Sequence, residues 1–188
     1  IRFGEQDIRR VNTATLRAQE SLVTQETELF DDTIENNIRI AKRDATREEV
    51  EAACKKAALD GFIRSLPKGY DTPVGELGGT LSGGERQRAW IAMTIAQEPE
   101  ILILDDSTSA LDLATEARLR SSLRSSLSDT TVIMVAQRIA SVRDADRIAV
   151  IENDGSILHF APHNVLMRES ATYRDIYNSQ MNNSAEGE

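Results

Sequence analysis

Two neighbouring carboxylates, Asp105 and Asp106, follow a short apolar run in the segment ILILDDSTSALD at residues 101–112. The run of Ile and Leu predicts a buried strand, and the Ser-Thr-Ser after it predicts a turn. Acidic residues in such a position either form part of a catalytic or binding site or simply mark the end of a strand. The neighbouring segments of the sequence must decide between these two interpretations.

The segment LSGGERQR at residues 81–88 predicts a helix start built for an anion. Ser82 is expected to cap the helix, and Glu85 stands three residues on, as in a capping box. Gly83 and Gly84 let the backbone approach a ligand closely, while free N–H groups and the helix dipole favour a negative charge. For Ser-Gly-Gly taken alone, a glycine turn that merely starts a helix is an equally good interpretation.

Several ordered segments together resemble the ATP-binding domain of ABC transporters. LSGGERQR resembles the family's signature motif, and ILILDDSTSALD follows at the spacing that the family uses. LVTQET (22–27) resembles the Q-loop, and TPVGELGG (72–79) resembles the X-loop of ABC exporters. TVIMVAQRIASV resembles the switch strand and H-loop, and GSILHFAPHNVL resembles the family's GTHxEL region. The resemblance covers residues 1 to about 180.

The resemblance implies an α/β fold, a P-loop NTPase-like ABC ATPase core with an inserted helical subdomain. We expect an ABC ATP-binding domain over residues 1–181, with the helical subdomain at about 32–97 and a RecA-like core at 1–31 and 98–181. Residues 182–188 are expected to be a disordered tail. The pattern of the residues agrees, because helices dominate the first half and alternate with buried strands in the second.

Individual elements are predicted by local signals. Helices are expected from Thr46, from Ser82, and from Asp112 to about Ser126, each with a capping residue at its start. The β-branched run at 130–137 predicts a fully buried strand.

The resemblance assigns roles to residues that match the family's motifs. In this family two domains form a sandwich dimer that encloses ATP between the signature motif of one and the phosphate loop of the other. Asp105 would hold Mg²⁺ directly or through water, and Gln25 would touch the metal or the attacking water. The nucleotide-binding set is Gln25, Ser82, Gly83, Gly84 and Glu85, and the set for dimer contact and coupling is Ser109, Leu111, Asp112 and Glu76.

Two positions in the catalytic set depart from the family's pattern. Asp106 stands where the family usually has the Glu that orients or deprotonates the attacking water, and Gln137 stands where it has the switch His. The shorter Asp side chain would place its carboxylate about 1 Å short, and such a displacement can cost about 100-fold in rate. A glutamine can donate a hydrogen bond to a phosphate, but it cannot carry a positive charge. In the X-loop, Leu77 replaces the family's Arg.

A phosphate loop is also absent from the sequence. That loop needs a Lys directly after a Gly, and none of the four lysines follows a glycine. We therefore expect that the sequence is truncated at its N-terminal side. We also expect that the domain on its own binds ATP poorly and is inactive.

These features predict an exporter subunit with a degenerate site. The altered residues belong to the half of the active site that would contact this domain's own nucleotide. The signature motif would instead contact the nucleotide of a partner domain, which is expected to be a different subunit. The other expected partner is a transmembrane domain at the cytoplasmic face of the cell membrane. The alternatives are a catalytically inactive ABC-like fragment or interaction module, and a soluble ABC ATPase of DNA repair or chromosome structure. The latter carries long insertions between Q-loop and signature that this sequence lacks.

Composition narrows the function classes. The 188 residues carry 31 acids and 22 bases, a net charge of −9, which argues against nucleic-acid binding. The single cysteine, Cys54, permits no internal disulfide and favours a reducing compartment. The longest uninterrupted apolar runs have about five residues, whereas a membrane span needs about 20.

Overall fold

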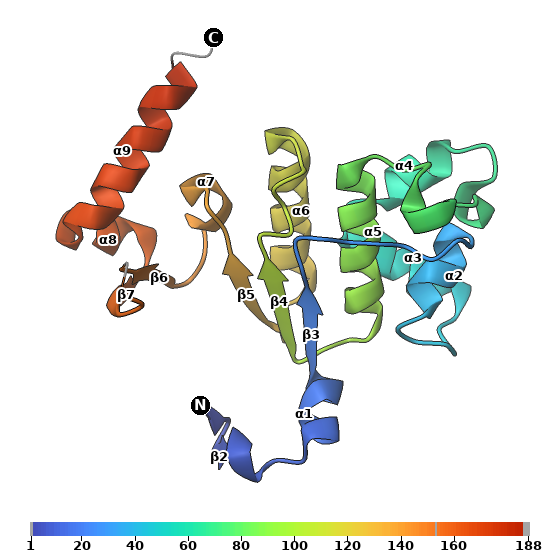
Figure 1. The fold of residues 1–188 in the computed structure, drawn as a ribbon, viewed down its shortest axis with the longest axis horizontal. Coiled ribbons are helices and arrows are strands. Elements are labelled where there is room, and N and C mark those ends of the chain that lie inside the picture. The colour runs from blue at the N-terminus through green and yellow to red at the C-terminus, as the bar shows by residue number, and fades with distance from the viewer. Residues whose placement is uncertain (1, 153, 186–188) are drawn as a thin grey trace. The chain divides into compact units, whose positions relative to one another are not determined.

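The structure, a computed structural model, describes residues 2–152 and 154–185 of the chain. The chain forms two compact units, the first ending at Val135 and the second beginning at Ala136 (Figure 1).

A parallel three-stranded sheet forms the centre of the first unit. Its strands are β3 (Glu20–Val23), β4 (Ile101–Asp105) and β5 (Thr131–Val135), in the order β3-β4-β5 (Figure 1). Val23 pairs with Leu104, and Asp105 pairs with Val135, so the carboxyl ends of all three strands meet at one edge. The α/β class and the strand before the two aspartates are confirmed.

The prediction that residues 130–137 form a fully buried strand is wrong. Val132, Ile133 and Val135 keep 37%, 46% and 52% of their surface exposed. In the described part of the first unit, β5 pairs with β4 alone and lies at the edge of the sheet. A β-branched run shows that a strand can be buried, but other elements must supply its cover.

Helices fill the long connection between β3 and β4. They are α2 (Ile34–Arg39), α3 (Arg47–Lys56), α4 (Asp60–Ser65) and α5 (Gly83–Ala96). The capping boxes predicted at Thr46 and Ser82 are both confirmed. The helix α6 (Leu113–Ser126) joins β4 to β5 and begins at its predicted cap, Asp112. The loop between α4 and α5, residues 66–82, contains two 3₁₀ turns, Gly69–Asp71 and Glu76–Gly78.

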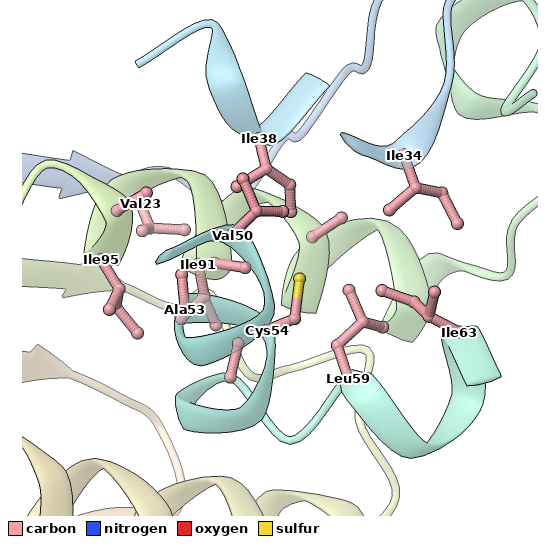
Figure 2. Close-up of a cluster of buried hydrophobic side chains, with 14 of the residues drawn as sticks. Val23, Ile34, Ile38, Val50, Ala53, Cys54, Leu59, Ile63, Ile91 and Ile95 are labelled. Atoms are coloured by element: carbon pink, nitrogen blue, oxygen red, sulfur yellow. The ribbon is translucent and has the colours of Figure 1, made fainter. Parts of the chain in front are cut away.

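One apolar core holds these helices to the sheet. Figure 2 shows side chains of α2, α3, α4 and α5 pointing toward one another, among them Ile38, Val50, Cys54 and Ile91. Each of these side chains is fully buried, and burying an aliphatic side chain contributes about 1.5–3 kcal/mol. Strand residues such as Leu104 belong to the same cluster. The boundary between a helical subdomain and a RecA-like core therefore stays a prediction.

The N-terminal residues form small elements that lead into β3. A two-residue hairpin, β1 (Arg2–Phe3) with β2 (Gln6–Asp7), precedes a 3₁₀ turn at Ile8–Arg10 and the helix α1 (Thr13–Gln19).

The second unit has its own small core. It contains α7 (Ile139–Val142), the antiparallel strands β6 (Ile148–Ile151) and β7 (Ile157–Ala161), α8 (His163–Glu169) and α9 (Ala171–Ala185). The tail was predicted to begin at residue 182, but α9 continues to Ala185. The Asn and Ser residues there permit a helix, because their helix propensities lie only a fraction of a kcal/mol per residue below those of better helix formers. Residues 186–188 lie outside the described residues. In the part of the chain that the structure describes, no helix is both long and apolar enough to cross a membrane.

Candidate functional site

The candidate metal ligands lie at the carboxyl edge of the sheet. Asp105 is the last residue of β4 and is exposed. Gln25 is also exposed and follows β3 by two residues, and the pairing of Val23 with Leu104 brings these two strand ends to the same level. This edge is where ligands of open α/β sheets bind. Carboxylate and amide oxygens also suit Mg²⁺, which takes one or two protein ligands and otherwise phosphate and water. The described residues contain no cluster of three or more His, Cys, Asp or Glu, and these few oxygen donors fit a nucleotide-bound Mg²⁺.

Asp106 has an unusual backbone conformation directly after the strand. Its φ is +46°, in the left-handed region that Asn and Asp adopt more readily than other non-glycine residues. The turn is held by its backbone N–H, which donates to the Val135 carbonyl at 2.9 Å, and by the Ser109 hydroxyl, which donates to its carbonyl at 2.9 Å. The conformation suits Asp at this position better than the Glu that the family usually has.

The signature segment is a fully formed helix start. The Ser82 hydroxyl oxygen accepts a hydrogen bond from the Glu85 N–H at 3.3 Å, and the Glu85 carboxylate accepts one from the Ser82 N–H at 2.7 Å. Ser82 is exposed, whereas the carboxylate of Glu85 is directed back onto the backbone. The groups at this helix end that could contact an anion are therefore the exposed Ser82 hydroxyl and the first-turn N–H groups around the half-buried Gly83 and Gly84.

The glycine at 84 is required by a close approach of the segment that follows β4. A Cβ atom at Gly84 would lie 3.0 Å from the Leu111 side chain and 3.3 Å from the Ala110 carbonyl oxygen. The same segment is held by Gln87, a buried residue of α5 whose side-chain carbonyl accepts a hydrogen bond from the Ala110 N–H at 3.3 Å. The predicted D-loop thus packs directly on the signature helix of the same chain.

Two side chains with structural roles in this region were not singled out from the sequence. Gln87 is one, although a polar residue one helical turn before Ile91, on the apolar face of α5, was a usable signal. The other is Glu116 in the first turn of α6, which is 1% exposed and accepts a hydrogen bond from the Thr108 hydroxyl at 3.1 Å. No sequence pattern marked Glu116, because an acid near a helix start is usually explained by the helix dipole alone.

The remaining D-loop residues divide between solvent and the core. Leu111 is buried, and Ser109 is exposed. The Asp112 carboxylate accepts a hydrogen bond from the Thr115 N–H at 2.9 Å and caps α6. The hydrogen bonds from Thr115 hold the pKa of Asp112 below its usual value, so this cap is charged at neutral pH.

The predicted X-loop is tied to α5 through Arg86. Arg86 donates to the Leu81 carbonyl at 2.6 Å, and its side chain fills the space where a Cβ of Gly78 would lie. Glu76 and Leu77 are exposed, and Leu77 has a φ of +52°. An acidic and an apolar side chain are thereby presented together on a loop that is anchored to the signature helix.

Gln137 belongs to the second unit, where its backbone is held by the side-chain amide of Gln180 in α9. That amide donates to the Gln137 carbonyl at 2.8 Å and accepts a hydrogen bond from the Ile139 N–H at 2.8 Å. The helix α7 has no side-chain cap from its own N-cap residue, Arg138. Gln180 therefore caps α7 from another helix and fixes the segment that carries Gln137, which is itself exposed.

These elements have the α/β fold of the ABC-type P-loop ATPases. The model of the family described as "ABC transporter" matches residues 1–109. The chain belongs to the ABC transporter family.

Solved and curated relatives share this fold and sequence. A solved structure described as a bacterial Atm1-family ABC exporter with ATP bound superposes with a TM-score of 0.87 at 42% identity, over 93% of this chain and 31% of that one. The ATM1-type heavy metal exporter of Novosphingobium aromaticivorans is 43% identical over 99% of this chain and 30% of its own length. ATP-binding cassette sub-family B member 6 of Homo sapiens is 43% identical over 96% of this chain and 21% of its own length. The chain thus spans about a fifth to a third of these relatives and corresponds to an ATP-binding domain of the exporter type.

Proposed function

We propose that this chain is the ATP-binding domain of an exporter that couples ATP binding and hydrolysis to transport across a membrane. It would work at the cytoplasmic face of the cell membrane, joined to a transmembrane domain and paired with a second ATP-binding domain. The similarity to membrane exporters over nearly the whole chain supports this function. The exposed X-loop residue Glu76 is the proposed contact to the transmembrane domain.

In this proposal, the intact signature segment contacts the nucleotide that the partner domain holds. Ser82, with the N–H groups of the first turn of α5, would bind the γ-phosphate of ATP held by the partner, and Glu85 would act indirectly by fixing Ser82. The exposed Ser109 would reach across the dimer interface, while Leu111 in the core and Asp112 at the cap of α6 would hold the D-loop in place for this contact. The packing of the D-loop on α5 supports these roles. Gly84 and Gln87 join the two segments, so that they form one continuous surface.

The half that faces this domain's own nucleotide is proposed to be degenerate. Asp105 and Gln25 would hold Mg²⁺, which when bound neutralises charge on the phosphates. Asp106 would place its carboxylate about 1 Å short of the position of a Glu. Gln137 could orient a phosphate oxygen by donation but would add no positive charge. The observation that carries the proposal is the contrast between a complete signature segment and these two altered residues.

The test is an ATPase assay of the full-length transporter that contains this domain and its partner subunit. Ser82→Ala should remove most of the activity, because it damages the partner's active site. Asp106→Asn should change the activity by less than about twofold, because its own site contributes little. Equal losses from both variants would sink the degenerate-site proposal. A transporter without ATPase activity before any substitution would favour the catalytically inactive interaction module.

A further inference from the structure

A pocket of about 530 Å³ lies between α3, α4, α5 and α6 in the first unit. This volume falls in the range of small-molecule sites, roughly 300–1,000 Å³. Its chemically important lining residues are Lys55, Asp60, Phe62, Arg88, Thr115 and Arg118. The nucleotide roles proposed above use none of these side chains.

The lining of the pocket carries three cations, Lys55, Arg88 and Arg118, against one carboxylate, Asp60. Arg88 donates to two neutral acceptors, the Ala58 carbonyl at 2.7 Å and the Gly84 carbonyl at 3.2 Å. Arg118 donates to the Thr115 hydroxyl at 3.0 Å. Among the described residues, neither arginine forms an ion pair, and Lys55 forms none either. This is unusual in a chain with a net charge of −9.

The one carboxylate of the lining, Asp60, interacts electrostatically with Lys55, but its hydrogen bonds go to residues outside the three cations. Asp60 accepts hydrogen bonds from the Tyr70 hydroxyl at 2.6 Å and from Arg64 at 2.9 Å. Burial lowers the pKa of Arg88, and the charge of Arg118 acts in the same direction, whereas the carboxylates of Glu85 and Asp112 act against this shift. Cations that repel one another around a hollow are stabilised by an anion placed between them.

We propose that this pocket binds a small phosphate-bearing anion, held by Lys55, Arg88 and Arg118. Guanidinium groups match the oxygens of a phosphoryl group, and a lysine adds a point charge. Arg88 keeps its Nη2 donors for such a ligand, because its hydrogen bonds within the described residues use only Nε and Nη1. Three cations favour a ligand with several negative charges, such as a diphosphate. The diphosphate could be free or part of a nucleotide.

Calorimetric titration of the 188-residue chain with inorganic pyrophosphate, without metal and at low salt, tests the site. Arg118→Glu should weaken binding by about tenfold or more, and Lys55→Ala by about three- to tenfold. Both side chains are exposed on helices, so both variants should fold. The matched controls are Arg17→Glu on α1 and Lys68→Ala in the loop between α4 and α5, which change the same charges elsewhere and should leave binding within about twofold.

Several results would overturn the proposal. They are the absence of pyrophosphate binding, equal losses in the control variants, and a larger loss from Ser82→Ala, which would place the anion at the start of α5. Titration with ADP distinguishes the source of the diphosphate. Binding of ADP at least about tenfold tighter than pyrophosphate, and still sensitive to Arg118→Glu, assigns the site to a nucleotide. Equal affinities assign it to the free diphosphate.

Discussion

The side chain of Gln87 on the signature helix accepts a hydrogen bond from the backbone N–H of Ala110 in the D-loop, at 3.3 Å. Gln87 is only 4% exposed, and the bond itself is partly buried. The two segments that are proposed to meet the partner domain are therefore coupled within one chain before any partner binds.

Replacing Gln87 tests this coupling. Gln87→Ala should cost about 1–3 kcal/mol in the free energy of unfolding, because the Ala110 N–H loses its acceptor. It should also lower the ATPase activity of the assembled transporter. Gln97→Ala is the matched control, since Gln97 accepts a hydrogen bond from the Ser21 hydroxyl at 2.6 Å, away from the D-loop. Denaturant unfolding and ATPase assays would contradict the coupling if both variants lost activity equally.

Adding a methyl group at Gly84 tests the close packing of the same two segments. A Cβ at this position would lie 3.0 Å from the Leu111 side chain, whereas a Cβ at Gly61 in α4 would meet nothing within 4 Å. Gly61→Ala should stabilise the chain by up to about 1 kcal/mol through helix propensity. Gly84→Ala should be less stable than Gly61→Ala by about 1–3 kcal/mol, because the D-loop must move. Thermal unfolding of both variants measures the difference, and equal stabilities would show that the packing is loose.

How much of this site follows from the sequence depends on the kind of contact. The capping boxes at Thr46 and Ser82, the strand before Asp105 and the cap at Asp112 are local, and each was predicted from residues within one helical turn. The contacts of Gln87 with Ala110 and of Gln180 with Gln137 join residues 23 and 43 positions apart, and no local pattern encodes them. The exposure of β5 was missed for the same reason, since burial depends on what the rest of the molecule supplies.

The Gln180 amide should control the mobility of the segment that carries Gln137. Gln180→Ala should speed hydrogen exchange at the Ile139 N–H by about tenfold, because the amide loses its acceptor. Gln180→Glu keeps that acceptor and should protect Ile139 better than alanine does, although it cannot donate to the Gln137 carbonyl. Asn178→Ala, an exposed change on the same helix, serves as the control. An exchange rate at the Ile139 N–H that is the same in all three variants as in the parent chain would rule out this role for Gln180.

The cap at Asp112 predicts a pH dependence of stability. The pKa of Asp112 is lower in the folded chain than in the unfolded one, so its contribution is fully present above the unfolded value of about 3.9. That contribution should be lost as the pH falls through the lower, folded pKa. Asp112→Asn keeps a cap but cannot titrate, so the stability difference from the parent chain should be constant above about pH 4 and change below it. Denaturant unfolding at a series of pH values measures this difference, and a constant difference down to pH 2 would contradict the assignment.

The most direct test of the degenerate half-site is ATP hydrolysis by the assembled transporter after the partner subunit's own catalytic acid has been removed. If the roles proposed for Asp106 and Gln137 are right, any remaining hydrolysis then comes from the nucleotide that this domain itself holds. We expect almost none, and we expect Asp106→Glu combined with Gln137→His to raise it by about 100-fold. Hydrolysis that stays near half of the unmodified rate before this repair would contradict the account.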